Sequence, residues 1–161
     1  MTVQDDAVAA IRADQRFWRE LAAEVGVDRY AEPGPMGAWT FGDVAGHLLG
    51  WRNRSIARLE ALADGAPEPA NPWPADLDGD DDRVNAWIRE QHAGRSAAQL
   101  VADYDASYDR LAAVIARIPD DTLTDRSAVP WLGGLALVEA NFTSHLHDEH
   151  VPDIRAWLDA S

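Results

Sequence analysis

Residues 39–51, WTFGDVAGHLLGW, predict where a long apolar helix begins and where it carries a histidine. Thr40 stands three residues before Asp43, a weakened capping box in which the hydroxyl caps free amides and the carboxylate adds negative charge to the first turn. Apolar side chains then recur at helical spacing, so we expect a helix from about Phe41 to Ala63. His47 lies within its apolar stretch.

A second helix is expected before this one, and a long connection after it. Apolar residues at threes, fours and sevens predict a helix over Val3–Val25, which Gly26 ends. Prolines and glycines predict a loop at residues 32–37. The proline-rich stretch over residues 64–79 is long for a helix connection. It therefore predicts a crossover, with Trp73 anchored against the core.

The C-terminal half of the chain predicts two more helical regions. One is interrupted near Gly94, restarts at a capping box beginning with Ser96, and ends at Pro119, before a linker that runs to residue 134. The other runs from about Leu135 to His150, and Pro152 can be tolerated where a new turn starts, so Asp153 to Asp159 form a short extension or a kinked continuation. Four long helices with a long crossover between the second and third predict an all-α fold, a four-helix bundle in one domain over residues 1–161.

Composition limits the function classes. The 161 residues include no cysteine, which excludes disulfides, thiolate metal sites and a cysteine nucleophile. A net charge of -14 would repel a phosphate backbone, so nucleic acid is not an expected partner. No apolar run is long enough to span a membrane, and the acidic N-terminal stretch does not resemble a signal peptide. We expect a cytoplasmic protein.

The stretch 39–51 resembles the helix-two signature of the DinB/YfiT superfamily, in which an aromatic residue and a capping turn precede a histidine in an apolar helix. Residues 85–88, 96–111 and 140–157 resemble the ClbS/DfsB branch of that superfamily. The resemblance implies a bundle with a central pocket. It also implies one of several activities, because the superfamily includes metal-dependent hydrolases, thiol-dependent transferases and isomerases.

The resemblance also implies a possible metal site, because members of the superfamily that bind a metal are similar in using three histidines. One of these is on helix two and two are on the last helix. By this resemblance His47 is the first ligand, and the last two come from His145, His147 and His150. Neutral imidazoles suit Zn, Ni, Mn or Fe, and three ligands leave positions open for water and substrate. The alternative is a site without metal, in which His47 and one terminal histidine are hydrogen-bonded pocket residues.

The spacing of the terminal histidines leaves the ligand set open. No two of them are four residues apart, and His147 points away from the apolar stripe of an ideal helix. His145 and Glu149 face inward better. A local bulge before Pro152 would bring His145 and His150 into one site. In a catalytic site we expect His47, His150 and Glu149 to activate water, directly or through a metal.

Aromatic residues are the candidates for the wall of a substrate pocket, and core packing is their alternative role. The candidate substrate-binding residues are Trp39, Trp51, Trp87, Tyr104, Tyr108 and Phe142.

We predict a ClbS/DfsB-like protein that acts on a small reactive molecule, with hydrolysis and self-resistance of the producing cell implied by the resemblance. One alternative is a metal-dependent hydrolase or a thiol-dependent transferase. Others are a non-catalytic protein that sequesters its ligand and an oligomeric interaction module such as a homodimer.

Overall fold

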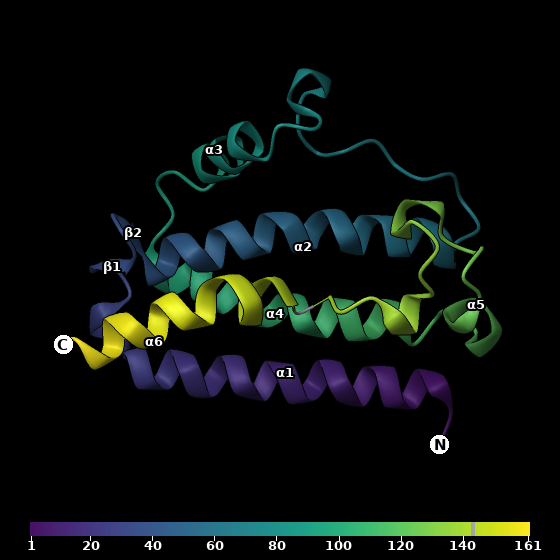
Figure 1. The fold of residues 1–161 in the computed structure, drawn as a ribbon, viewed down its shortest axis with the longest axis horizontal. Coiled ribbons are helices and arrows are strands. Elements are labelled where there is room, and N and C mark those ends of the chain that lie inside the picture. The colour runs from purple at the N-terminus through teal and green to yellow at the C-terminus, as the bar shows by residue number, and fades with distance from the viewer. Residues whose placement is uncertain (143) are drawn as a thin grey trace.

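The computed structural model describes residues 1–142 and 144–161 and is mostly helical, as Figure 1 shows, which confirms the predicted all-α class. The helices and strands are α1 (Val3–Val25), β1 (Pro33–Met36), β2 (Trp39–Thr40), α2 (Phe41–Ala63), α3 (Asp81–Gln91), α4 (Ala97–Ile115), α5 (Asp120–Thr124), a π-helix (His145–His150) and α6 (Val151–Asp159). Short 3-10 turns occupy Val27–Arg29, Ala75–Leu77, Pro130–Leu132 and Leu137–Glu139.

The first two long helices have the predicted bounds. In α2, the Thr40 hydroxyl accepts a hydrogen bond from the Asp43 amide at 3.0 Å, and the Asp43 carboxylate accepts one from the Thr40 amide at 2.9 Å. The helix start is therefore fixed by contacts within four residues. Gly26, with a φ of 82°, follows α1 as predicted.

The main core lies between α1, α2 and α4, and α6 runs alongside them (Figure 1). Trp18 of α1 is its central residue, stacked on Phe41 at 4.9 Å and in edge contact with Tyr104 at 4.7 Å between ring centroids. Helix α2 packs against the start of α4 so closely that a Cβ on Gly42 would lie 2.6 Å from the Cα of Ala97. This packing fixes the first turn of α2 against the start of α4.

The segment between α2 and α4 packs separately. The break predicted near Gly94 is present: α3 ends at Gln91, and α4 begins at Ala97 behind the capping box of Ser96. Trp73 is buried as predicted, but in a second small core with Leu77, Val84 and Ile88. In Figure 1 this segment lies beyond α2, away from α1.

Two predictions about connecting segments were wrong. Residues predicted as a loop over 32–37 contribute to an antiparallel hairpin of β1 and β2, in which Pro33 pairs with Thr40 and Met36 with Trp39. The predicted linker before residue 134 contains the short helix α5.

The last predicted helix, Leu135–His150, was wrong over its first half. The chain there forms a 3-10 turn, and Leu135 and Val138, which an amphipathic helix would place on its apolar face, are 46% and 44% exposed. Instead Ala136 and Leu137 are buried, and the Glu139 carboxylate accepts a hydrogen bond from the Ala136 amide at 2.7 Å. This bond caps the start of the 3-10 turn, and the chain leaves helical geometry at Ala140, whose backbone is extended.

Of the two outcomes expected beyond Pro152, a short extension or a kinked continuation, the C-terminal segment forms a continuation. It passes without a break from the π-helix through Pro152 to Asp159. Proline is tolerated there because it occupies the first turn of α6. None of the helices in the described parts of the chain is long and apolar enough to cross a membrane.

Candidate metal centre

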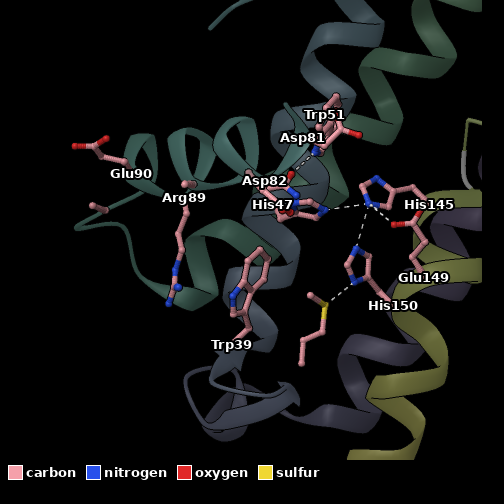
Figure 2. Close-up of a pocket in the computed structure, with 14 residues that line it drawn as sticks. Trp39, His47, Trp51, Asp81, Asp82, Arg89, Glu90, His145, Glu149 and His150 are labelled. Carbon is pink, nitrogen blue, oxygen red and sulfur yellow. Dashed lines mark hydrogen bonds and ion pairs between the residues drawn. The ribbon is translucent and has the colours of Figure 1, made fainter. Parts of the chain in front are cut away.

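Three histidines from two distant parts of the chain converge on one point. The Nε2 atom of His145 lies 2.9 Å from Nε2 of His47 and 3.2 Å from Nε2 of His150. One ring nitrogen of each residue lies within 4.8 Å of the others. Figure 2 shows the three rings pointing toward one another, His47 from α2 and the other two from the C-terminal segment.

The π-helix brings His145 and His150 together. These residues are five positions apart, which an α-helix places on different faces. A π-helix closes hydrogen bonds from residue i to i+5, so its first and sixth residues approach one another. The local bulge considered from the sequence is therefore present, and His145 and His150 are the pair that it brings to His47.

Burial keeps the three imidazoles neutral. Together with the neighbouring histidines, burial lowers the pKa of His47 to about 3 and that of His150 to about 4. Burial also lowers the pKa of His145, partly opposed by the Glu149 carboxylate. A neutral imidazole has a nitrogen lone pair available, which is the form that binds a metal ion.

The spacing of the nitrogens fits a tetrahedral metal. Zinc–nitrogen bonds of about 2.0–2.1 Å place two ligand nitrogens about 3.3 Å apart at a tetrahedral angle. The two closest separations in the cluster, 2.9 and 3.2 Å, are near that value. Neutral imidazoles at these separations can share N–H···N hydrogen bonds, or, with their protons on Nδ1, offer three lone pairs to one divalent metal ion.

The second ring nitrogens of His150 and His47 have different surroundings. The Nδ1 atom of His150 lies 3.0 Å from the Sδ atom of Met36, a weak acceptor that favours a proton on Nδ1 and a free lone pair on Nε2. The Nδ1 atom of His47 is buried without a hydrogen-bond partner among the described residues. Trp39 packs edge-on against the His47 ring at 5.4 Å between centroids.

The histidines face a cavity of about 960 Å³, here called the outer cavity. Its lining includes Met36, Trp39, Trp51, the three histidines and Glu149, and on the α3 side Asp81, Asp82, Asn85, Arg89 and Glu90. In Figure 2, Arg89 and Glu90 of α3 lie on the side away from His145 and His150. The Oε2 atom of Glu149 lies 3.4 Å from Nε2 of His145. A ligand in the outer cavity would therefore have both the imidazoles and a carboxylate within reach.

His147 is not part of the cluster, so its inclusion among the expected ligands is corrected. Its Nε2 atom forms a contact with Asp14, and its ring lies 4.5 Å from that of Phe17. Both partners belong to α1, on a different side from His47. His147 therefore connects the C-terminal segment to α1.

The predicted aromatic residues are divided among different places. Trp39 and Trp51 line the outer cavity, whereas Tyr104 and Phe142 line a second, smaller cavity behind His145. The other two are corrected: Tyr108 is fully buried in the main core, and Trp87 packs against the small core around Trp73.

Sequence analysis did not identify three residues near the cluster. Met36 was assigned to a loop, and its contact with His150 depends on the hairpin. Asn85 accepts a hydrogen bond from Trp51 Nε1 at 2.9 Å, and it faces the outer cavity from α3. Arg52 is buried at 6% exposure, next to Trp51 in the sequence. An arginine inside an apolar helix is the one signal that pointed to any of them.

Fold and site together define a helical protein with a cluster of three histidines that could hold a metal ion beside an open cavity. The family model described as the mycothiol maleylpyruvate isomerase N-terminal domain matches residues 11–148, and the chain belongs to this family. The family is part of the DinB/YfiT-like superfamily, as the sequence resemblance implied, whereas the ClbS/DfsB branch stays a prediction. No curated protein and no solved structure gives a significant match.

Proposed function

We propose that this protein is a metal-dependent enzyme that uses a thiol cosubstrate to transform a small electrophilic molecule. The observation that carries the proposal is the convergence of three neutral imidazole nitrogens, from His47, His145 and His150, on the wall of the outer cavity. A divalent metal bound there would lower the pKa of a bound thiol and polarise a carbonyl group.

The thiol must come from outside the chain, which contains no cysteine. The name of the family refers to mycothiol, and this supports a low-molecular-weight thiol as the cosubstrate. The outer cavity of about 960 Å³ is at the upper end of the range for small-molecule sites. Such a volume suits two reactants held together.

The residues around the cluster have separate roles in this proposal. His47, His145 and His150 hold the metal. Glu149, whose side chain is 68% exposed and whose Oε2 lies 3.4 Å from His145, accepts the proton that the nucleophile releases. Trp39 and Trp51 form apolar walls that exclude water from one side of the reactants.

Hydrolysis is the second candidate, and the position of Glu149 favours it. A carboxylate beside a histidine-bound metal can take a proton from water as readily as from a thiol. The hydrolysis of a reactive metabolite implied by the ClbS/DfsB resemblance would use the same residues. The requirement for a thiol distinguishes the two reactions.

The first experiment measures bound metal per chain in untagged protein. We expect near-stoichiometric zinc, nickel, manganese or iron in the wild type and little in His47→Ala, His145→Ala or His150→Ala. His147→Ala is the matched control, since it removes a histidine from the same helix and should keep the metal. Absence of metal after incubation with all four ions, or loss in His147→Ala alone, would contradict the proposed centre.

The second experiment tests the thiol. Metal-loaded protein is mixed with mycothiol or glutathione and 1-chloro-2,4-dinitrobenzene, and absorbance reports the formation of the thioether. We expect turnover with thiol that His47→Ala abolishes while circular dichroism stays unchanged. Stoichiometric uptake of the electrophile without product would instead identify a protein that sequesters its ligand.

A further inference from the structure

A second cavity lies directly behind the metal centre. This inner chamber, of about 280 Å³, shares Trp51 and His145 with the outer cavity, so His145 forms part of the wall of both. Most of its other walls are apolar, from Leu48, Leu111, Leu132, Trp131 and Phe142. The charged side chain on its wall is Arg52.

Arg52 is buried without an acidic partner. Only 6% of the residue is exposed, and among the described residues no carboxylate forms an ion pair with it. Its Nη2 donates to the Tyr104 hydroxyl at 2.7 Å, and its Nη1 donates to Ser107 Oγ at 3.2 Å. The guanidinium also lies over the rings of Tyr104 and Tyr108, 4.3 and 4.0 Å from their centroids.

These contacts fix the orientation of the guanidinium but leave its charge unbalanced. Asp14 is connected to Arg52 only indirectly, because the Tyr108 hydroxyl donates to Asp14 at 2.7 Å and lies 3.5 Å from the Tyr104 hydroxyl. The other oxygen of Asp14 contacts His147. A guanidinium carries five N–H donors in a planar fork that matches a carboxylate. A buried cation of this kind, held by neutral groups at the wall of a cavity, is suited to an anionic ligand.

The charges of the outer cavity direct a carboxylate inward. Asp81, Asp82 and Glu90 of α3 line the outer cavity together with Glu149, and they would repel a carboxylate there. Arg89 is the basic residue of that rim, and it lies 3.7 Å from the carboxylate of Asp43. The inner chamber therefore offers an anion the more favourable position.

We propose that Arg52 binds the carboxylate of the substrate in the inner chamber, so that the substrates are small, largely apolar carboxylic acids. This inference rests on the proposed function, for which it names the substrate class. The carboxylate lies against Arg52 and Tyr104, the apolar part of the acid fills the space between Leu132 and Phe142, and its reactive end passes His145 toward the outer cavity.

The test uses benzoate and its uncharged analogue benzamide as probes on metal-free protein. Binding is followed by the fluorescence of the tryptophans, two of which line the inner chamber. We expect wild-type protein to bind benzoate at least tenfold more tightly than benzamide. Arg52→Met should remove this difference and leave benzamide binding unchanged. The matched control is Arg54→Met, since Arg54 donates a hydrogen bond to Asn71 and is not among the residues that line the chamber.

Three results would overturn the inference. They are no benzoate binding by the wild type, benzoate binding by Arg52→Met as tight as by the wild type, or a loss of benzoate binding in Arg54→Met as large as that in Arg52→Met. If Arg52→Met fails to fold, Leu132→Trp fills the chamber without touching the charge and should abolish benzoate binding; binding that persists counts against the inference. Benzoate that binds only after zinc is added, and equally to Arg52→Met, would place the carboxylate on the metal. That result would overturn the role of Arg52 and retain the proposed metal centre.

Discussion

His145 and His150 are five residues apart, yet their Nε2 atoms lie 3.2 Å from one another because the intervening chain is a π-helix. A π-helical turn within an α-helix is equivalent to the insertion of one residue. The π-helix therefore brings His145 and His150 to one face although they are five residues apart. In an α-helix, two residues share a face in this way when they are four residues apart. His47 from α2 completes the cluster only while this extra residue is accommodated.

Deletion of Asp148 should keep the metal centre. Asp148 is exposed and lies inside the π-helix. Its removal allows an α-helix in which the residues that are now His145 and His150 are four positions apart. We expect metal per chain equal to that of wild type. Insertion of an alanine after Asp148 should instead turn His150 away and weaken zinc binding at least about tenfold, as measured by competition with a chromophoric chelator. The reverse order of affinities would refute the role assigned to the π-helix.

Met36→Leu should weaken zinc binding by about tenfold with little effect on the fold. The change removes the sulfur that lies 3.0 Å from His150 Nδ1, and with it the contact that favours a free lone pair on Nε2. The two side chains have similar volumes, so the cost in unfolding free energy should be below about 1.5 kcal/mol. Zinc affinity and thermal unfolding are measured on the same samples. Met36→Gln, which supplies an amide oxygen as acceptor, should restore part of the affinity, and unchanged affinity in Met36→Leu would contradict this role.

The metal-free protein should lose stability as the pH falls from 7 to 5.5. Burial lowers the pKa of His47 to about 3 and that of His150 to about 4, from 6.5. Below pH 6.5 the unfolded chain takes up protons that the folded chain does not bind, so stability present above that pH is progressively lost. We expect the free energy of unfolding to be lower at pH 5.5 than at pH 7 by about 1 kcal/mol for each of these two histidines. Urea unfolding of EDTA-treated protein at both pH values measures it.

The control for this prediction is the double variant His47→Gln and His150→Gln. This variant keeps every carboxylate that also titrates in acid. The decrease in its free energy of unfolding between pH 7 and 5.5 should therefore be smaller than that of the wild type by about 2 kcal/mol. An equal loss in the two proteins would mean that the histidines do not titrate differently in the folded and unfolded states.

Sequence reasoning succeeded where the determinants are local. Thr40 and Asp43 contact one another within one turn, and both ends of α2 were placed correctly from such signals. His47 could be identified as a site residue because the stretch around it, residues 39–51, resembles the helix-two signature of the DinB/YfiT superfamily. These features depend on the chain within a few residues of each position.

The terminal half of the site could not be predicted with the same certainty because its geometry depends on distant contacts. Periodicity does not distinguish an α-helix from a π-helix, so three terminal histidines remained candidates until His147 was found against Asp14 of α1. The exposed Leu135 and Val138 continue a helical pattern that the turn at residues 136–140 interrupts. Arg52 and Met36 are site residues only because the tertiary fold places them beside His145 and His150.

Gly42→Ala should destabilise the protein by about 2 kcal/mol, because α2 and α4 approach one another at this residue. A Cβ there would lie 2.5 Å from the Cβ and 2.6 Å from the Cα of Ala97, and a backbone atom cannot move aside without shifting a helix. Gly46→Ala, one turn later, is the matched control: its Cβ would meet only side chains, 3.2 Å from His92 and 3.3 Å from Leu100. The gain in helix propensity of about 1 kcal/mol should offset that contact. Urea midpoints measure both variants. Since α2 carries His47, Gly42→Ala should also lower zinc occupancy, and equal stability of the two variants would show that the helices separate readily at Gly42.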